Sequence, residues 1–248
     1  MKKKIATLCL SVLAFAGSAG NAQVTGFNDL ATWTGSGTNQ SALVIQWNDG
    51  KSPGALAWGF RWDTPGTTVS DMLLEVMDAA VGLFARGDLS TGFGPSYFGF
   101  GYDTGIDGTF GVTGATDPLG APVNLVFANG LSNTNTNDAS TQAPLTSIGT
   151  APVDAQDRYR EGWMDNGFWE LYSGTGIAYP ITWTASFIGA GETLAANGWY
   201  AFSISNADFS SNLPGAAFAA IPEPSTLALL AAGGILLVIH ARKRFHAC

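Results

Sequence analysis

The most regular alternation of hydrophobic and polar positions lies in residues 42–62. Leu43, Ile45 and Trp47 fall on one face of a predicted strand, and residues 48–54 form a turn segment rich in Asn, Asp, Gly and Pro. The same alternation returns after the turn, at Leu56, Trp58, Phe60 and Trp62. The pattern predicts a β-hairpin with one aromatic face, whose tryptophans form a core under a covering element.

The spacing of apolar residues changes to that of a helix after the hairpin. Residues three and four positions apart repeat at Val69, Met72, Leu73, Val76, Met77 and Ala80. Thr68 and Asp71 have the spacing of a capping box, and an acidic first turn suits the helix dipole. We therefore expect a single main helix over about residues 69–84, packed across the aromatic face of the hairpin.

The rest of the middle of the chain has weaker signals. Residues 91–120 are dense in glycine and aromatic residues, which fits either short strands with glycine corners or a long functional loop. A further strand is predicted at 123–127 and an exposed polar loop at 129–150. Aromatic segments broken by glycine predict more strands within 163–205.

The N-terminus has the pattern of a secretory signal peptide. Residues 1–22 contain three lysines, then an apolar stretch, then small residues just before Gln23. We expect cleavage after Ala22, through the secretion machinery.

The C-terminus has the pattern of a membrane anchor. Residues 225–241 contain no Asp, Glu, Lys or Arg and could form roughly 25 Å of helix, at the short end for a bilayer core of about 30 Å. The basic cluster Arg242, Lys243 and Arg244 follows at once. By the positive-inside rule this tail stays cytoplasmic, which places the middle of the chain outside the membrane.

The triplet Pro222, Glu223 and Pro224 precedes the expected membrane helix. The triplet, the apolar stretch and the basic cluster together resemble the PEP-CTERM sorting signal. The resemblance implies recognition by an exosortase, a membrane-embedded, transpeptidase-like enzyme of Gram-negative bacteria, and removal of the helix near the triplet. It also implies a link to exopolysaccharide and biofilm. Residues 47–63 are similar to a segment of uncharacterised exported bacterial proteins, which brings no activity with it.

These features divide the chain into four parts. We expect a signal peptide at 1–22, a β-rich exported domain at 23–205, a stalk at 206–221 and a sorting signal at 222–248. The predicted fold class is α+β, mainly β, with one main helix. The expected location is the outer side of the cytoplasmic membrane, followed by processing to the cell surface or extracellular matrix.

Composition restricts what the exported part can bind or catalyse. Residues 23–221 contain five basic and 18 acidic residues, a net charge of −13. Such a surface repels phosphate backbones, so nucleic acid is excluded as a partner. The same residues contain no His and no Cys, which excludes Ser-His-Asp and Cys-His catalysis and typical zinc sites.

The function that fits best is a non-enzymatic surface or matrix protein linked to exopolysaccharide. One alternative is a carbohydrate-binding module, with an exposed aromatic platform at Trp163, Trp169 and Trp199. Another is a glycosidase built on two carboxylates, for which Asp63 and Glu170 are the candidates because they lie beside aromatic residues.

A calcium site is the one cofactor that the sequence suggests. Asp103, Asp107 and Asp117 lie in or near a glycine-rich segment, and calcium prefers several oxygens from a flexible loop. Their spacing does not match an EF-hand, so ordinary turn aspartates are the simpler interpretation. No other cofactor is expected.

Overall fold

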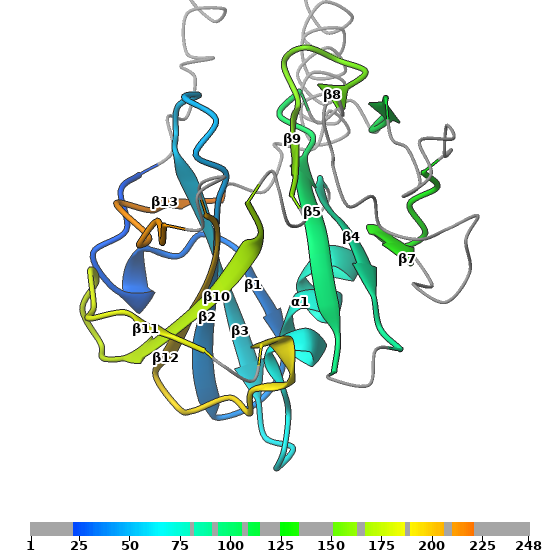
Figure 1. Ribbon diagram of the computed structural model, residues 1–248. Helices are drawn as coiled ribbons and strands as arrows, with labels where there is room; N and C mark the ends of the chain where they lie inside the picture. The colour runs from blue at the N-terminus through cyan, green and yellow to red at the C-terminus, as the bar shows by residue number, and fades with distance from the viewer. Residues whose placement is uncertain are drawn as a thin grey trace, which may run out of the picture.

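The computed structural model describes residues 22–79, 82–90, 94–105, 109–114, 125–133, 151–162, 167–186, 189–205 and 210–220 (Figure 1). The described part of the chain forms a larger and a smaller β-sheet, with helix α1, Val69–Ala79, between them. This arrangement confirms the predicted fold class, α+β and mainly β, with one main helix among the described residues.

The larger sheet is mixed and holds seven strands among the described residues. They are β1 (Trp33–Gly35), β2 (Asn39–Gln46), β3 (Ala55–Trp62), β10 (Trp169–Thr175), β11 (Thr184–Ala185), β12 (Gly198–Ile204) and β13 (Phe218–Ala219). Their order is β1-β3-β2-β12-β10-β11, and β13 also pairs with β3. The predicted hairpin is β2 and β3, with Leu43 opposite Trp58. At the centre, β12 runs parallel to β2.

The smaller sheet follows the helix in sequence. Its described strands are β4 (Leu83–Asp88), β5 (Ser96–Tyr102), β7 (Leu131–Asn133) and β9 (Arg158–Glu161), in the order β7-β4-β5-β9. A separate pair consists of β6 (Val112–Thr113) and β8 (Ala151–Pro152), and two short 3₁₀ helices are η2 (Phe27–Asp29) and η3 (Gly189–Gly191). Of the two possibilities for 91–120, short strands are present at 96–102 and 112–113 among the described residues. Residues 125–127 are the described part of the strand expected at 123–127. They form no strand, and Leu125 and Phe127 pack against Tyr159 of this sheet.

Helix α1 begins where the sequence predicts and ends earlier. The backbone N–H of Thr68 donates to the Asp71 carboxylate at 2.8 Å, and that of Asp71 donates to the Thr68 hydroxyl at 3.2 Å, which forms the capping box. The helix ends at Ala79, and β4 begins at Leu83 instead of continuing the helix to residue 84. Gly82, with φ of 104°, adopts a backbone conformation that a helix does not contain.

The main core lies between the two sheets and under the helix. Trp47 and Trp58 are buried there against Tyr102 of the smaller sheet, as the hairpin pattern predicts, while Trp62 is half-buried. The Trp47 indole N–H donates to the carbonyl of Phe100 at 3.0 Å, so the same ring both packs and cross-links the sheets. Burial of such rings is the dominant stabilising term in this layer.

A second core covers the other face of the larger sheet. The strands present small residues on this face, including Ala42, Val44, Ala57 and Ala201, together with two rings of their own, Tyr172 and Trp199. Covering segments add the rings of Phe27 and Tyr179. Residues 210–220, most of the expected stalk, belong to this cover. Ala217, Ala219 and Ala220 are buried and β13 pairs with β3, so the folded domain extends to Ala220. The sequence did not predict this because the pairing joins segments about 160 residues apart.

A buried ion pair crosses the smaller sheet. Arg86 on β4 and Glu161 on β9 are both opposite Gly99 of the intervening strand β5, and their side chains meet at 2.6 Å with no exposed area. A Cβ at Gly99 would lie 2.5 Å from the Tyr159 hydroxyl, which also donates to Glu161. Burial raises the pKa of Glu161, and the Arg86 charge opposes that rise.

The first prediction concerns Gly59, over which the Trp33 ring lies. A Cβ at this position would lie within 2.7 Å of three ring atoms of Trp33. We expect Gly59→Ala to lower the free energy of unfolding by about 1–3 kcal/mol, measured by urea denaturation. Gly54→Ala is the matched control, because a Cβ there meets nothing within 4 Å. Equal stability of the two variants would contradict the packing described.

The second prediction concerns the ion pair. Glu161→Gln removes the carboxylate that pairs with the buried Arg86 guanidinium at 2.6 Å, so we expect a loss of about 3–5 kcal/mol in the free energy of unfolding. The double variant Arg86→Met/Glu161→Met removes both charges and should recover most of that loss. If the double variant is as unstable as Glu161→Gln, altered packing and not the loss of the ion pair explains the lower free energy of unfolding.

Candidate functional site: two clefts beside helix α1

The outer face of α1 carries a line of acidic side chains. Asp71, Glu75 and Asp78 are exposed, with the half-buried Leu74 among them, while the other face of the helix is buried in the main core. This follows from the helical spacing of the apolar residues, which leaves the positions between them for solvent. Two clefts flank this acidic face, one on each side of the helix.

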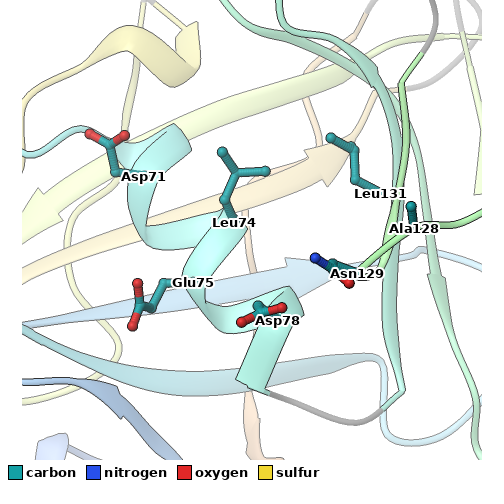
Figure 2. A pocket seen from close by; sticks show the side chains of 7 residues that line it. All are labelled: Asp71, Leu74, Glu75, Asp78, Ala128, Asn129 and Leu131. Carbon is teal, nitrogen blue, oxygen red and sulfur yellow. The ribbon is translucent and has the colours of Figure 1, made fainter.

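The first cleft, of about 530 Å³, separates α1 from the turn before β7. It is lined by Asp71, Leu74, Glu75, Asp78, Ala128, Asn129 and Leu131 (Figure 2). Mutual backbone hydrogen bonds between Ala128 and Leu131, of 2.9 and 3.0 Å, close the turn that holds Asn129 beside the helix. Figure 2 shows Asp71 and Glu75 projecting from the side of the helix away from this turn.

The second cleft, of about 450 Å³, lies on that opposite side, so Asp71 and Glu75 border both clefts. Its other lining residues come from the β1–β2 turn, the end of β3 and the loop before α1: Gly35, Ser36, Phe60, Arg61, Trp62, Asp63, Thr64 and Thr67. Gly35 has φ of 66° and lies against the carbonyl of Arg61, where a side chain would clash. A glycine is therefore required for the turn to form this wall.

Neighbouring groups hold the polar side chains of the second cleft in place. The guanidinium of Arg61 lies 4.6 Å from the centre of the Trp33 ring, a cation–π geometry on the face of β3 opposite Trp62. The Trp62 indole N–H donates to the Ser41 hydroxyl at 3.2 Å. The Asp63 carboxylate accepts hydrogen bonds from the backbone and the hydroxyl of Thr38, both at 2.8 Å, and these bonds lower the pKa of Asp63.

The second cleft is suited to recognition by hydrogen bonds. It combines carboxylate acceptors (Asp63, Asp71 and Glu75) with a half-buried indole (Trp62), and Arg61 borders it from the strand whose other face carries its guanidinium. In the part of the chain that the structure describes, no three His, Cys, Asp or Glu side chains are placed to hold a metal ion.

Two of the three tryptophans expected on an exposed platform are buried. Trp199 has no exposed area, and its indole N–H donates to the carbonyl of Gly176 at 2.8 Å. Trp169 is 7% exposed and packs against Phe100, with 4.8 Å between ring centres. The platform prediction is therefore wrong for these two, because their strands are covered on both faces by segments remote in sequence. Trp163 lies outside the described residues.

The two carboxylates considered for glycoside hydrolysis are far apart. Glu170 lies opposite Ser203, which lies opposite Gln46. Gln46 in turn lies opposite Ala55, at the start of β3, whereas Asp63 follows the end of that strand. Eight residues of strand span about 26 Å, well beyond the roughly 5–10 Å that separates catalytic carboxylates. Asp63 and Glu170 therefore do not form a catalytic pair.

The remaining predicted site residues lie mostly outside the described part. Asp103 is 2% exposed, and its backbone N–H donates to the carbonyl of Gly82 at 2.9 Å, while Asp107 and Asp117 lie outside. The triplet at 222–224, the apolar stretch at 225–241, the basic cluster at 242–244 and the expected signal peptide, but for its last residue Ala22, also lie outside it. Within the described ranges, no helix has the length and apolarity needed to cross a bilayer.

Sequence reasoning did not propose the second cleft as a site. The available signal was at the end of the hairpin, where two charged residues, Arg61 and Asp63, flank Trp62. The alternation placed Trp62 in the core, and the contribution of the β1–β2 turn to the cleft wall is not visible in the strand pattern.

Comparison with known proteins gives one match. No curated protein and no solved structure matches the chain. The family model of the PEP-CTERM protein-sorting motif matches residues 220–244, which confirms the resemblance seen in the triplet, the apolar stretch and the basic cluster. The chain is therefore an exported, membrane-associated precursor that carries a PEP-CTERM protein-sorting motif and is a substrate of an exosortase.

Proposed function

We propose that the folded domain is a non-enzymatic surface or extracellular-matrix protein, associated with exopolysaccharide after sorting. The observation that carries this proposal is the sorting motif itself, which starts at residue 220, where the folded domain ends. The wide separation of Asp63 and Glu170 supports a role without catalysis, since it removes the carboxylate pair that the sequence offered for glycoside hydrolysis.

The distribution of charge supports the same role. Each of the five basic residues between Gln23 and Ile221 contacts a carbonyl, a carboxylate or an aromatic ring; they are Lys51, Arg61, Arg86, Arg158 and Arg160. The surface therefore presents mainly carboxylates. A strongly acidic exterior keeps a protein soluble and limits nonspecific association, which suits a component of a hydrated matrix.

A carbohydrate-binding role is the second candidate, and the second cleft favours it. Trp62 offers part of an indole face in a cleft that the carboxylate residues Asp63, Asp71 and Glu75 also line. Sugars are bound by such combinations, because the apolar face of the ring stacks on the indole and the hydroxyls pair with planar polar groups. The exopolysaccharide of the host is the ligand to test.

Intact-mass analysis tests the sorting step. The protein is isolated from its native host, with and without the exosortase. We expect a mass ending near residues 221–224 only in the strain that has the enzyme, since the motif begins where the folded domain ends. A mass running through Cys248 in both strains would show that the anchor is retained, and the matrix location would then be wrong.

Affinity electrophoresis in gels that contain the host exopolysaccharide tests the second cleft. Trp62→Leu removes the indole face but keeps an apolar contact with the core, and we expect its retention to fall by about 2–12-fold, equivalent to about 0.5–1.5 kcal/mol. Ile177→Ala is the control, because Ile177 is a large exposed apolar residue that does not line the cleft. Equal retention of both variants and the wild type would exclude binding at this cleft.

A further inference from the structure

The two ends of the folded domain meet at one edge of the larger sheet. Gln23 and Phe218 form an antiparallel bridge. The N–H of Val24 donates to the carbonyl of Ala217, and the N–H of Ala219 donates to the carbonyl of Ala22, both at 2.9 Å. The expected signal-peptide cleavage point and the start of the sorting motif are therefore neighbours in space.

The last described residue is fixed in the sheet on both sides of its Cα. The N–H of Ala220 donates to the carbonyl of Ala57 at 3.0 Å, and its carbonyl accepts from the Thr32 hydroxyl at 2.6 Å. Ala220 is 2% exposed. Only Ile221 separates it from Pro222, so the first proline of the triplet lies within about 7 Å of a fixed residue.

The chain cannot continue along the sheet edge beyond Ala220. Strand β1 occupies the next part of the same edge, where Trp33 pairs with Gly59 and the carbonyl of Thr32 accepts from Gly59 at 2.8 Å. The part of the edge that is open to β13 therefore ends at Ala220, beside Ala31 and Thr32. Ala31 is exposed and Thr32 and Trp33 are partly exposed, so these three residues form an exit rim around the point where the motif leaves the domain.

We propose that this exit rim, Ala31, Thr32 and Trp33, is a contact surface for the exosortase. An enzyme that binds residues 222–224 in a cleft surrounds the chain at that point. Because a single residue links the triplet to Ala220, the rim of that cleft lies against the domain. The enzyme therefore contacts the folded edge whenever it engages the motif at its natural distance from the domain. This inference rests on the sorting motif and is independent of what the domain binds.

An opened edge is the competing arrangement. Releasing β13 would lengthen the tether, but it would break the hydrogen bonds of Val24 and Ala220, which do not involve the expected signal peptide, and expose Ala217 and Phe218. Each such bond contributes about 0.5–1.5 kcal/mol, and the buried side chains add to the cost. The closed edge is therefore the state that the enzyme meets.

The first experiment places a bulky charge on the exit rim of the full-length chain in the native host. Removal of the C-terminal segment is followed by intact mass over time. We expect Ala31→Arg to slow it at least about tenfold, because a small misplacement of the reacting bond has large effects on rate. Ala196→Arg, an exposed position just before β12, which β3 and β2 separate from β1, is the matched control and should be processed like the wild type.

A flexible insertion tests whether Ala31→Arg slows processing through contact with the enzyme or through a folding defect. A Gly/Ser linker of about 12 residues between Ala220 and Ile221 moves the motif roughly 20 Å from the exit rim. We expect it to restore processing of Ala31→Arg. If Ala31→Arg is processed at the wild-type rate without the linker, or remains slow with it, the exit rim does not contact the enzyme.

The second experiment asks whether the edge must open. Gln23→Cys/Phe218→Cys places two cysteines at an antiparallel bridge, close enough for a disulfide in the oxidising environment outside the membrane. We expect the cross-linked chain and the single variant Gln23→Cys to be processed equally fast. Arrest of the cross-linked chain alone would show that β13 must detach, and would overturn the proposal.

Discussion

Where a large aromatic ring crosses directly over a neighbouring strand, that strand must carry a glycine, and this constraint recurs in both sheets. Trp33 lies over Gly59, and the Tyr159 hydroxyl lies over Gly99. Phe110 lies over Gly101 in the same way. Protein interiors are packed nearly as densely as crystals of small organic molecules. Each of these glycines therefore fixes the place at which its covering ring can lie. The glycines at positions 59, 99 and 101 are consequences of this pairing between rings and bare backbone.

Local patterns predicted what local interactions determine. The β2–β3 hairpin and the start of α1 follow from alternation, helical spacing and a capping box within a few residues. The in-strand glycines of β5 looked like corners because the rings that cover them, Phe110 and Tyr159, come later in the sequence. The buried state of Trp199 depends likewise on Phe27 and Tyr179, whose approach no local pattern reveals.

The site shows a similar division between residue type and position. Sequence identified Asp63 as a carboxylate beside aromatic residues, but its orientation depends on Thr38 in the preceding turn, and its distance from Glu170 depends on the order of four strands. The basic residues illustrate the same point. Three of them, Lys51, Arg158 and Arg160, connect the β2–β3 turn to residues 155–160 and so hold the two sheets together. The composition of the chain shows that basic residues are few, but not what they contact.

The parallel pairing of β2 with β12 has a consequence for how the protein reaches its location. The centre of the larger sheet joins residues 39–46 to residues 198–204, and its edge strand β13 is completed only at residue 219. A fold dominated by such long-range contacts forms slowly, because loop closure must precede the contacts that stabilise it. A chain exported from its N-terminus cannot assemble this sheet until almost all of it has emerged. High contact order thus keeps the polypeptide unfolded while it is being exported. The domain finishes folding only when its sorting motif reaches the membrane.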